Sequence, residues 1–307
     1  MYYSLYPFAH RQNRLSCDRE EFDTMQIVKD YKHDDRLRVQ LGALARETFG
    51  LDIEPWYQAG FWDERYVPYS VFEDGCIAAN VSLNRVTVVY DGKPHAAAMI
   101  GTVMTAQPYR GRGYARQLMD TVLQDCKQDA AFVYLFANDT VLDFYPKFGF
   151  TRTEEMQCVV SLDGQGIAVG EPPQKLRVTH PDDLAVLLRL IETGIPAPKR
   201  LLVPTIRSLV LFYCITMYQD SVFYYPGRDL LVFYHDGVLL DYYSGAPMSL
   251  VEVCGLIAPE KRELTLGFTP MDTAGLTCQY RLYDDNLFTT NPAPVAGGAM
   301  FPSLSRA

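Results

Sequence analysis

The stretch Arg110-Gly111-Arg112-Gly113-Tyr114-Ala115 decides the fold of the first part of the chain, because it joins an apolar stretch (95–106) to an amphipathic one (114–127). Its two glycines let the backbone curl and let a ligand approach it closely. A helix that begins here presents unpaired N–H groups and a partial positive charge, to which the arginines add. The turn is therefore a candidate site for an anion with several oxygens, such as a diphosphate.

Two better-known phosphate-binding turns do not fit these residues. A Walker loop ends in Gly-Lys-Ser/Thr, and a dinucleotide fingerprint has three glycines in GxGxxG spacing, whereas this turn has GxG alone. A plain tight turn with surface arginines explains the six residues as well as a phosphate site does. The helices and strands predicted around the turn are therefore needed to distinguish a phosphate site from a plain tight turn.

Working outward from the turn, alternating apolar residues predict strands and a spacing of three to four predicts helices. Asp34 and Asp35 can cap the first helix and Gly50 ends it. The predicted strands are 25–32, 67–73, 76–90, 95–106, 132–137 and 150–162, and the predicted helices are 36–49, 55–64, 114–127 and 139–148. This is a mixed α/β pattern in which the turn leads from a buried strand into a helix.

The second part of the chain repeats the middle of this order, which suggests a duplicated domain. Its predicted helices are 182–192, one or two over 201–218, and 249–257, and its predicted strands are 221–225, 229–235, 237–243 and 263–268. With 307 residues the chain is long enough for two cores. We expect an N-terminal arm at 1–24, a first domain at 25–163, a linker rich in Gly and Pro at 164–173, a second domain at 174–291 and a surface extension at 292–307.

The composition excludes several classes of protein. A net charge of -9 without a block of Lys or Arg argues against nucleic-acid binding. No apolar run approaches the roughly 18 residues of a membrane span, and the N-terminus lacks the order of a secretory signal, so a cytoplasmic protein is expected. The seven cysteines form no CxxC pair, so we expect reduced core thiols and no metal site.

With these elements in place, the chain resembles the GNAT superfamily of N-acetyltransferases. The family pattern Arg/Gln-x-x-Gly-x-Gly/Ala after the fourth strand is matched by Arg110, Gly113 and Ala115. A second family pattern, an Asn followed by a Tyr and a Gly-aromatic pair, is matched by Asn138, Tyr145 and 149–150. The resemblance covers residues 25–160 and implies the acyl-CoA N-acyltransferase fold, a central mixed sheet flanked by helices.

The resemblance also implies a site for acetyl-CoA as co-substrate. The backbone from Arg112 to Ala115 would hold its pyrophosphate, and Asn138 would bond the pantetheine arm beside the exposed strand. Tyr145 would protonate the departing thiolate as the general acid. The residues expected to bind the cofactor are Val103, Met104, Thr105, Arg110, Gly111, Arg112, Gly113, Tyr114, Ala115 and Asn138.

The sequence shows no general base. The fourth strand of many family members carries a Glu, but the stretch from His95 to Thr105 has no acid, and His95 is its one titratable residue. In this family the second helix borders the acceptor site. Glu54, Asp63 and Glu64 flank that helix here and are candidates for contact with the substrate.

The second part lacks the glycine pattern. Ser-Gly-Ala-Pro-Met-Ser stands at 244–249, with no arginine, and Pro247 has no N–H to offer. We therefore expect a degenerate GNAT-like domain that has lost the cofactor. A pair of one active and one degenerate domain is loosely similar to the enhanced intracellular survival group of acetyltransferases.

These observations favour an acetyl-CoA-dependent N-acetyltransferase in which a primary amine attacks the thioester directly. The acceptor would be a small molecule or a peptide, and the sequence is compatible with a homo-oligomer. Two alternatives stay open: a non-catalytic acyl-CoA-binding sensor or interaction module, and acyl transfer to another class of acceptor.

Overall fold

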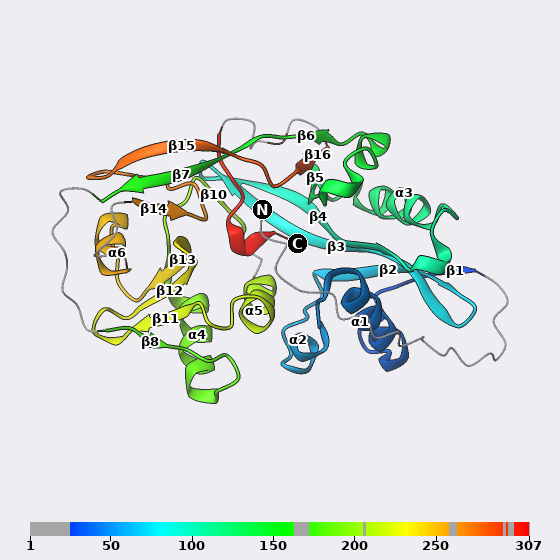
Figure 1. Ribbon diagram of the computed structural model, residues 1–307, viewed down its shortest axis with the longest axis horizontal. Helices are drawn as coiled ribbons and strands as arrows, with labels where there is room; N and C mark the ends of the chain where they lie inside the picture. The colour runs from blue at the N-terminus through cyan, green and yellow to red at the C-terminus, as the bar shows by residue number, and fades with distance from the viewer. Residues whose placement is uncertain are drawn as a thin grey trace.

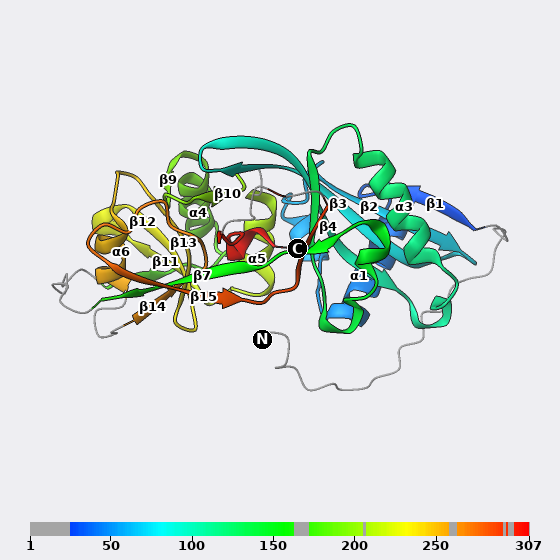
Figure 2. The same cartoon turned by 90° about the horizontal axis from the view of Figure 1, so that it is seen from above.

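The computed structural model describes residues 25–162, 172–204, 207–257, 263–290, 293 and 298–306. The expected arm at 1–24 lies outside them, as does the expected linker apart from residues 172 and 173. Within these residues the chain forms two mixed, eight-stranded sheets. Figure 1 shows the sheets side by side along the long axis of the molecule, each with its own helices, and Figure 2 shows the same arrangement from above.

The first sheet has the strand order β1-β2-β3-β4-β5-β16-β6, and β10 pairs with the end of β3. All neighbours are antiparallel except β4 and β5, which are parallel and therefore need a crossover between them. The strands are β1 (Gln26–Lys29), β2 (Tyr66–Glu73), β3 (Cys76–Tyr90), β4 (Lys93–Thr105), β5 (Phe132–Phe136), β6 (Thr151–Arg152), β10 (Leu201–Leu202) and β16 (Leu287–Thr289).

Helices cover both faces of this sheet. Helices α1 (Asp35–Phe49) and α2 (Glu54–Gln58) lie on one face, and α3 (Tyr114–Cys126), the crossover from β4 to β5, lies on the other (Figure 1). Asp34 caps α1 as predicted, since its carboxylate accepts the N–H of Leu37 at 3.1 Å. Gly50 ends the helix with φ +71°.

The second sheet has the order β15-β7-β14-β13-β12-β11-β8, and β9 pairs with β13. Here β13 and β14 are the parallel pair, and α6 connects them as α3 connects β4 and β5. The elements are β7 (Glu155–Ser161), β8 (Gln174–Lys175), α4 (Pro181–Thr193), β9 (Ile195–Pro196), α5 (Arg207–Thr216), β11 (Val222–Tyr225), β12 (Leu230–His235), β13 (Val238–Ser244), α6 (Leu250–Ile257), β14 (Glu263–Leu266) and β15 (Thr277–Tyr283).

The two parts of the chain exchange strands. Strand β7 follows β6 in the sequence, yet it lies between β14 and β15 in the second sheet. Strand β16, from the last part of the chain, lies between β5 and β6 in the first sheet. The structure thus differs from the expected division into 25–163 and 174–291, because each sheet is completed by a strand from the other part.

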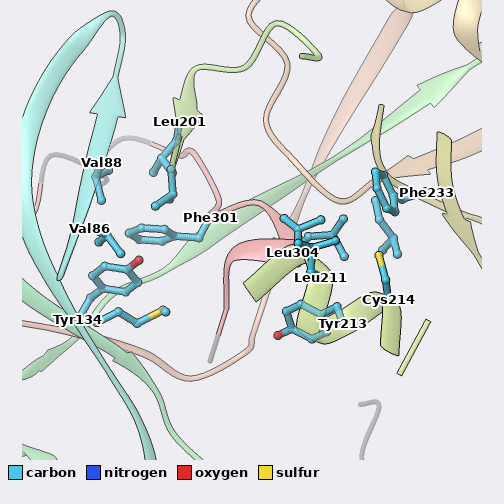
Figure 3. Close-up of a cluster of buried hydrophobic side chains, with 14 of the residues drawn as sticks. Val86, Val88, Tyr134, Leu201, Leu211, Tyr213, Cys214, Phe233, Phe301 and Leu304 are labelled. Carbon is cyan, nitrogen blue, oxygen red and sulfur yellow. The ribbon is translucent and has the colours of Figure 1, made fainter. Parts of the chain in front are cut away.

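The segment 298–306 also differs from the expected surface extension. Phe301 and Leu304 are fully buried, and the Phe301 ring stacks on Tyr134 of β5 with 4.3 Å between ring centres. Figure 3 shows Phe301 and Leu304 between side chains of both sheets. The Pro and Ser content suggested an exposed coil, but the apolar side chains of this segment gain more from filling the space between the sheets.

A buried ion pair lies at the start of β7, where the chain passes from β6 of the first sheet into the second sheet. The Arg306 guanidinium donates to both oxygens of Glu155, at 2.8 and 3.0 Å, and also to Asp285 at 2.7 Å. Burial raises the pKa of Glu155, and the charge of Arg306 opposes that shift. Removing Arg306 would leave the buried Glu155 carboxylate without a cation, whereas Arg306 would keep Asp285 if Glu155 were removed.

Some predicted helices are shorter than expected. Residues 139–148 form two 3-10 turns, η2 (Asp139–Val141) and η3 (Tyr145–Phe148), because Pro146 lacks the N–H that an α-helix needs there. The stretch 201–218 divides into β10 and α5, and α2 ends at Gln58 rather than Glu64.

The cysteines only partly match the expectation of reduced core thiols. Cys76, at the start of β3, is disulfide-bonded. The free thiols of the described residues are Cys126, Cys158, Cys214, Cys254 and Cys278. Spacing along the chain does not show which cysteines meet in the fold, so this bond was not predictable from the count.

Candidate active site

The glycine turn forms the start of α3. Gly113 is the residue before the helix, with φ +86°, and Gly111 has φ +80°, angles that side chains other than glycine rarely adopt. A Cβ atom at either position would meet no atom of the described chain within 4 Å. The space beside both glycines is therefore open, next to the first N–H groups of α3, which have no partner inside the helix.

Three arginines surround the turn, and the protein pairs one of them with a carboxylate. Arg112 donates to the carboxylate of Glu73 at 3.0 Å, and the Tyr114 hydroxyl donates to the same carboxylate at 2.7 and 2.8 Å. Arg110 and Arg116 are exposed. Sequence analysis missed Glu73, whose place directly before the β2–β3 hairpin turn brings it over the start of α3.

Strand β4 leaves part of one edge without a neighbouring strand. Its pairing with β5 covers Ala97 to Ile100, whereas its pairing with β3 on the other side continues to Thr105. Within the described chain, no strand pairs with residues 103–105 on the β5 side. An unpaired strand edge offers N–H and C=O groups to an extended ligand that carries amides. These are the residues that the resemblance assigns to pantetheine.

Tyr145 begins η3 among aromatic side chains, with its ring centre 5.3 Å from that of Phe144 and 5.7 Å from that of Phe288. It is 5% exposed, and burial raises its pKa to about 12. The hydroxyl is therefore protonated at neutral pH, as a proton donor requires. The aromatic contacts alone also fit a residue of the core.

Asn138 follows β5 and is exposed. Its side chain does not cap η2, so the described contacts do not support the alternative of a helix cap. The backbone beside it is held by Asn286, which accepts from the N–H of Ala137 at 3.0 Å and donates to its carbonyl at 3.2 Å. Asn286 was missed, because only the insertion of β16 into the first sheet brings it here.

The three acidic residues expected near the acceptor are all paired within the chain. The pairs are Glu54 with Arg38 at 3.0 Å, Asp63 with Arg65 at 2.8 Å and Glu64 with Lys32 at 2.7 Å. The hydrogen bonds from Arg38 and Lys32 hold the pKa values of Glu54 and Glu64 below their usual range. Because these carboxylates already neutralise cations of the protein itself, we do not expect them to bind a cationic substrate.

The other residues around α2 form a packed cluster. Trp56 and Trp62 are buried and stack at 5.4 Å between ring centres. The Trp56 indole donates to the carbonyl of Ser208 at 2.9 Å, which holds α2 against α5. His95 lies near the other end of β4 from Thr105, about 30 Å away at the rise of a strand, so it cannot serve as a base at the turn.

The corresponding place in the second sheet is filled by the chain itself. Strand β13 pairs with β14 only up to Leu239, and β9 then pairs with the same strand at Tyr243 and Ser244. In the loop after β13, Gly245 donates to the carbonyl of Asp229 at 2.8 Å. A Cβ atom at Gly245 would lie 2.1 Å from the Asp229 carboxylate. The space that is open at Gly111 and Gly113 is thus closed here, and a carboxylate stands beside it.

In the part of the chain that the structure describes, no three His, Cys, Asp or Glu side chains are grouped as a metal site would require. Nor does any helix there have the length and apolar character needed to cross a membrane.

Comparison with known proteins identifies the type of domain. Residues 38–153 match the family model of the acetyltransferase (GNAT) domain. No curated protein matches the sequence. A GCN5-related N-acetyltransferase from Kribbella flavida is 17% identical, with a TM-score of 0.52 over 87% of this chain and 71% of that one. Eis1 from Mycobacterium abscessus is 14% identical, with a TM-score of 0.52 over 87% and 72%. At these identities the likeness concerns the fold, and it extends over both sheets.

Proposed function

We propose that this chain, in which residues 38–153 form a GNAT acetyltransferase domain, transfers the acetyl group of acetyl-CoA to a primary amine. Acetyl-CoA is the co-substrate of that family of enzymes. The observation that carries the proposal is the open glycine turn at the start of α3, beside the unpaired edge of β4.

The cofactor would lie along these two features. The N–H groups from Arg112 to Ala115 would bind the pyrophosphate, because a helix start combines free donors with a partial positive charge. The backbone of Val103, Met104 and Thr105 would bond the amides of pantetheine. The turn and the strand are tied together, since Arg110 donates to the carbonyl of Thr105 at 3.2 Å. Asn138 would bond the pantetheine arm from the end of β5.

The reaction would proceed by direct attack. The neutral amine forms a bond to the acetyl carbon, the carbon–sulfur bond breaks, and the amine proton passes to water. Tyr145 would donate its proton to the departing thiolate and recover one from solvent. Its pKa of about 12 makes it a weak acid, but a thiolate that leaves beside this buried side chain would also be desolvated, which would raise its affinity for a proton.

Each chain would bind one cofactor. In the second sheet, β9 takes the edge of β13 and the Asp229 carboxylate stands at the loop that replaces the glycine turn. The second sheet would therefore serve the first through packing, as the contact of Trp56 with Ser208 in α5 indicates.

One observation favours a second candidate, a binding module without catalysis. No acid stands on β4 near the thioester, and Glu54, Asp63 and Glu64 are paired with cations. A sensor of acyl-CoA would need the turn and the strand edge but no base. An acceptor with a hydroxyl group remains the third hypothesis, and the same assay tests it.

The deciding experiment follows thiol release from acetyl-CoA in the presence of a panel of polyamines, aminoglycosides, amino acids and peptides, and of alcohols without an amine. Amine-dependent release with acetylated product by mass spectrometry supports the enzyme. Tight binding of acetyl-CoA without release for any amine or alcohol would support the sensor instead. No binding of acetyl-CoA at all would refute both.

A further inference from the structure

Thr102 in β4 has a backbone conformation that its side chain does not favour. Its φ is +44°, in the left-handed region. The other described residues with positive φ, apart from glycines, are all Asp or Asn, which tolerate that region: Asp30, Asp74, Asp91, Asp229, Asp236 and Asn286. A β-branched residue there is strained, and such strain persists only where neighbouring groups hold it.

The groups that hold Thr102 are polar and lie under α2. Its hydroxyl donates to Ser82 at 2.6 Å and lies 3.0 Å from the hydroxyl of Tyr66. The Asn80 amide donates to the Thr102 carbonyl at 2.9 Å and to Ser82 at 2.9 Å. Ser82 in turn donates to Tyr66 at 2.9 Å. We call Tyr66, Asn80 and Ser82 the polar lock.

The lock is built into the core and not onto the surface. Asn80 and Ser82 are fully buried, and the Tyr66 ring packs edge-on against Trp56 at 5.4 Å and Trp62 at 5.0 Å. Asn80 is also anchored from its other side, because its side-chain oxygen accepts from Ser70 at 2.9 Å. Burial raises the pKa of Tyr66, so its hydroxyl remains a neutral partner.

Thr102 lies where β4 is still paired with β3 on one edge but is no longer paired with β5 on the other. The register between β3 and β4 shifts between Asn80 and Ser82, so that Val81 faces two residues of β4, Thr102 and Val103. The pairing with β5 has ended two residues earlier, at Ile100. A bulge of this kind redirects the backbone that follows it, here residues 103–105.

We propose that Thr102 is a positioning residue: the polar lock holds it in the left-handed conformation and thereby sets the direction of the β4 edge that orients the thioester. The inference rests on the proposed function in taking residues 103–105 as the place of the pantetheine arm. The Thr102 hydroxyl does no chemistry in this account. Its three hydrogen-bond partners fix a backbone angle, and the backbone acts on the substrate.

Three substitutions separate this role from others. Thr102→Val keeps the shape of the side chain and removes the hydroxyl, so the lock is lost and the strain remains. Thr102→Ser keeps the hydroxyl. Thr102→Gly removes the side chain, yet glycine adopts positive φ without help. We expect kcat to fall by about 10- to 100-fold in the Val variant, as for a small misplacement of reacting groups. We expect the Ser and Gly variants to stay within about threefold of the wild type.

The KM for acetyl-CoA should change little in all three variants, because the pyrophosphate site lies elsewhere. Amide hydrogen exchange of the peptide containing residues 101–105 gives a readout without catalysis, and it should accelerate in Thr102→Val and not in Thr102→Ser. Thermal unfolding and CoA binding show that each variant is folded.

An equal kcat in the wild type and in Thr102→Val would overturn the inference. A kcat of Thr102→Gly as low as that of Thr102→Val would overturn it too, because the hydroxyl itself would then be needed. Unchanged exchange in the Val variant would also refute the lock. If wild-type protein releases no thiol with any amine, the proposed function fails, while the exchange experiment still tests the lock.

Discussion

The placement of the cofactor can be tested by adding one methyl group to the turn. Gly113→Ala puts a Cβ atom at a position with φ +86° and with no atom of the described chain within 4 Å. The protein itself therefore has room for the methyl group. The cost to folding is the backbone strain alone, about 1–2 kcal/mol.

The chain offers a matched control for that strain. Gly50 ends α1 with φ +71° and likewise has nothing of the described chain within 4 Å of its Cβ position. Gly50→Ala should lower the stability by the same about 1–2 kcal/mol, but at the end of a different helix. If Gly113→Ala binds CoA more weakly than Gly50→Ala does, the cause is contact between the ligand and the turn and not the backbone strain.

The expected effect on binding follows from the hydrogen bonds at the helix start. The new methyl group would stand between the N–H groups of α3 and the pyrophosphate. Loss of one hydrogen bond to a charged group costs about 1.5–3 kcal/mol, which corresponds to about 10- to 150-fold in affinity.

Isothermal titration with CoA and with acetyl-CoA measures the affinities, and thermal unfolding measures the strain. We expect Gly50→Ala to bind as tightly as the wild type and Gly113→Ala to bind at least about tenfold more weakly. Equal affinities for the two variants would show that the pyrophosphate does not lie at the start of α3, and the assignment of Arg112 to Ala115 would fall with it.

Five further outcomes are expected. Tyr145→Phe should lower kcat by about 100-fold or more with little change in the KM for acetyl-CoA; unchanged turnover would end its role as general acid. Because the raised pKa of Tyr145, about 12, keeps it protonated, no activity should be lost through this group between about pH 7 and 10, and a loss near pH 10 that disappears in the Phe variant would contradict this. Titration should give one CoA per chain, and a second site would mean that β9 does not close the second sheet. Glu73→Gln removes the carboxylate that pairs with Arg112 at 3.0 Å, which leaves this arginine free to attract the phosphates of CoA. CoA should then bind about two- to fivefold more tightly, and its affinity should depend more steeply on salt. Weaker binding would mean that Glu73 chiefly positions the turn. Lys199 and Asp241 form a buried ion pair at 2.6 Å, so Lys199→Met leaves Asp241 without its cation and should cost about 3–5 kcal/mol of stability. Adding Asp241→Leu should recover most of that loss. A similar loss of stability in the double variant would argue against an ion-pair effect.

The parts of the site that sequence analysis predicted are those that local chemistry encodes. A strand, two glycines and an amphipathic helix are contiguous, so the glycine turn at Gly111 and Gly113 and the helix start after it could be predicted from the sequence. The end of α1 at Gly50 and its start at Asp34 follow from capping in the same way. The match of the domain model to residues 38–153 agrees with that local evidence.

What escaped prediction depends on pairing over long distances. The bulge at Thr102 exists because of side chains on β2 and β3, and nothing in the sequence around Thr102 signals a positive φ. Glu73 reaches the turn only through a hairpin, and Asn286 only through the exchange of β16. The composition of 298–306 suggested a surface coil, because composition does not show that Phe301 has a partner in Tyr134.

The exchange of strands has a consequence for the synthesis of the protein. Val133 of β5 donates to Thr290, beside β16, across 157 residues of sequence. At translation rates of about 5–20 residues per second, the gap between β5 and β6 stays open for roughly 10–30 seconds after β5 has left the ribosome. During that time both strands expose unpaired edges that chaperones or other nascent chains can bind. A chain cut between the two parts would keep this gap open until the second fragment associated with the first and supplied β16.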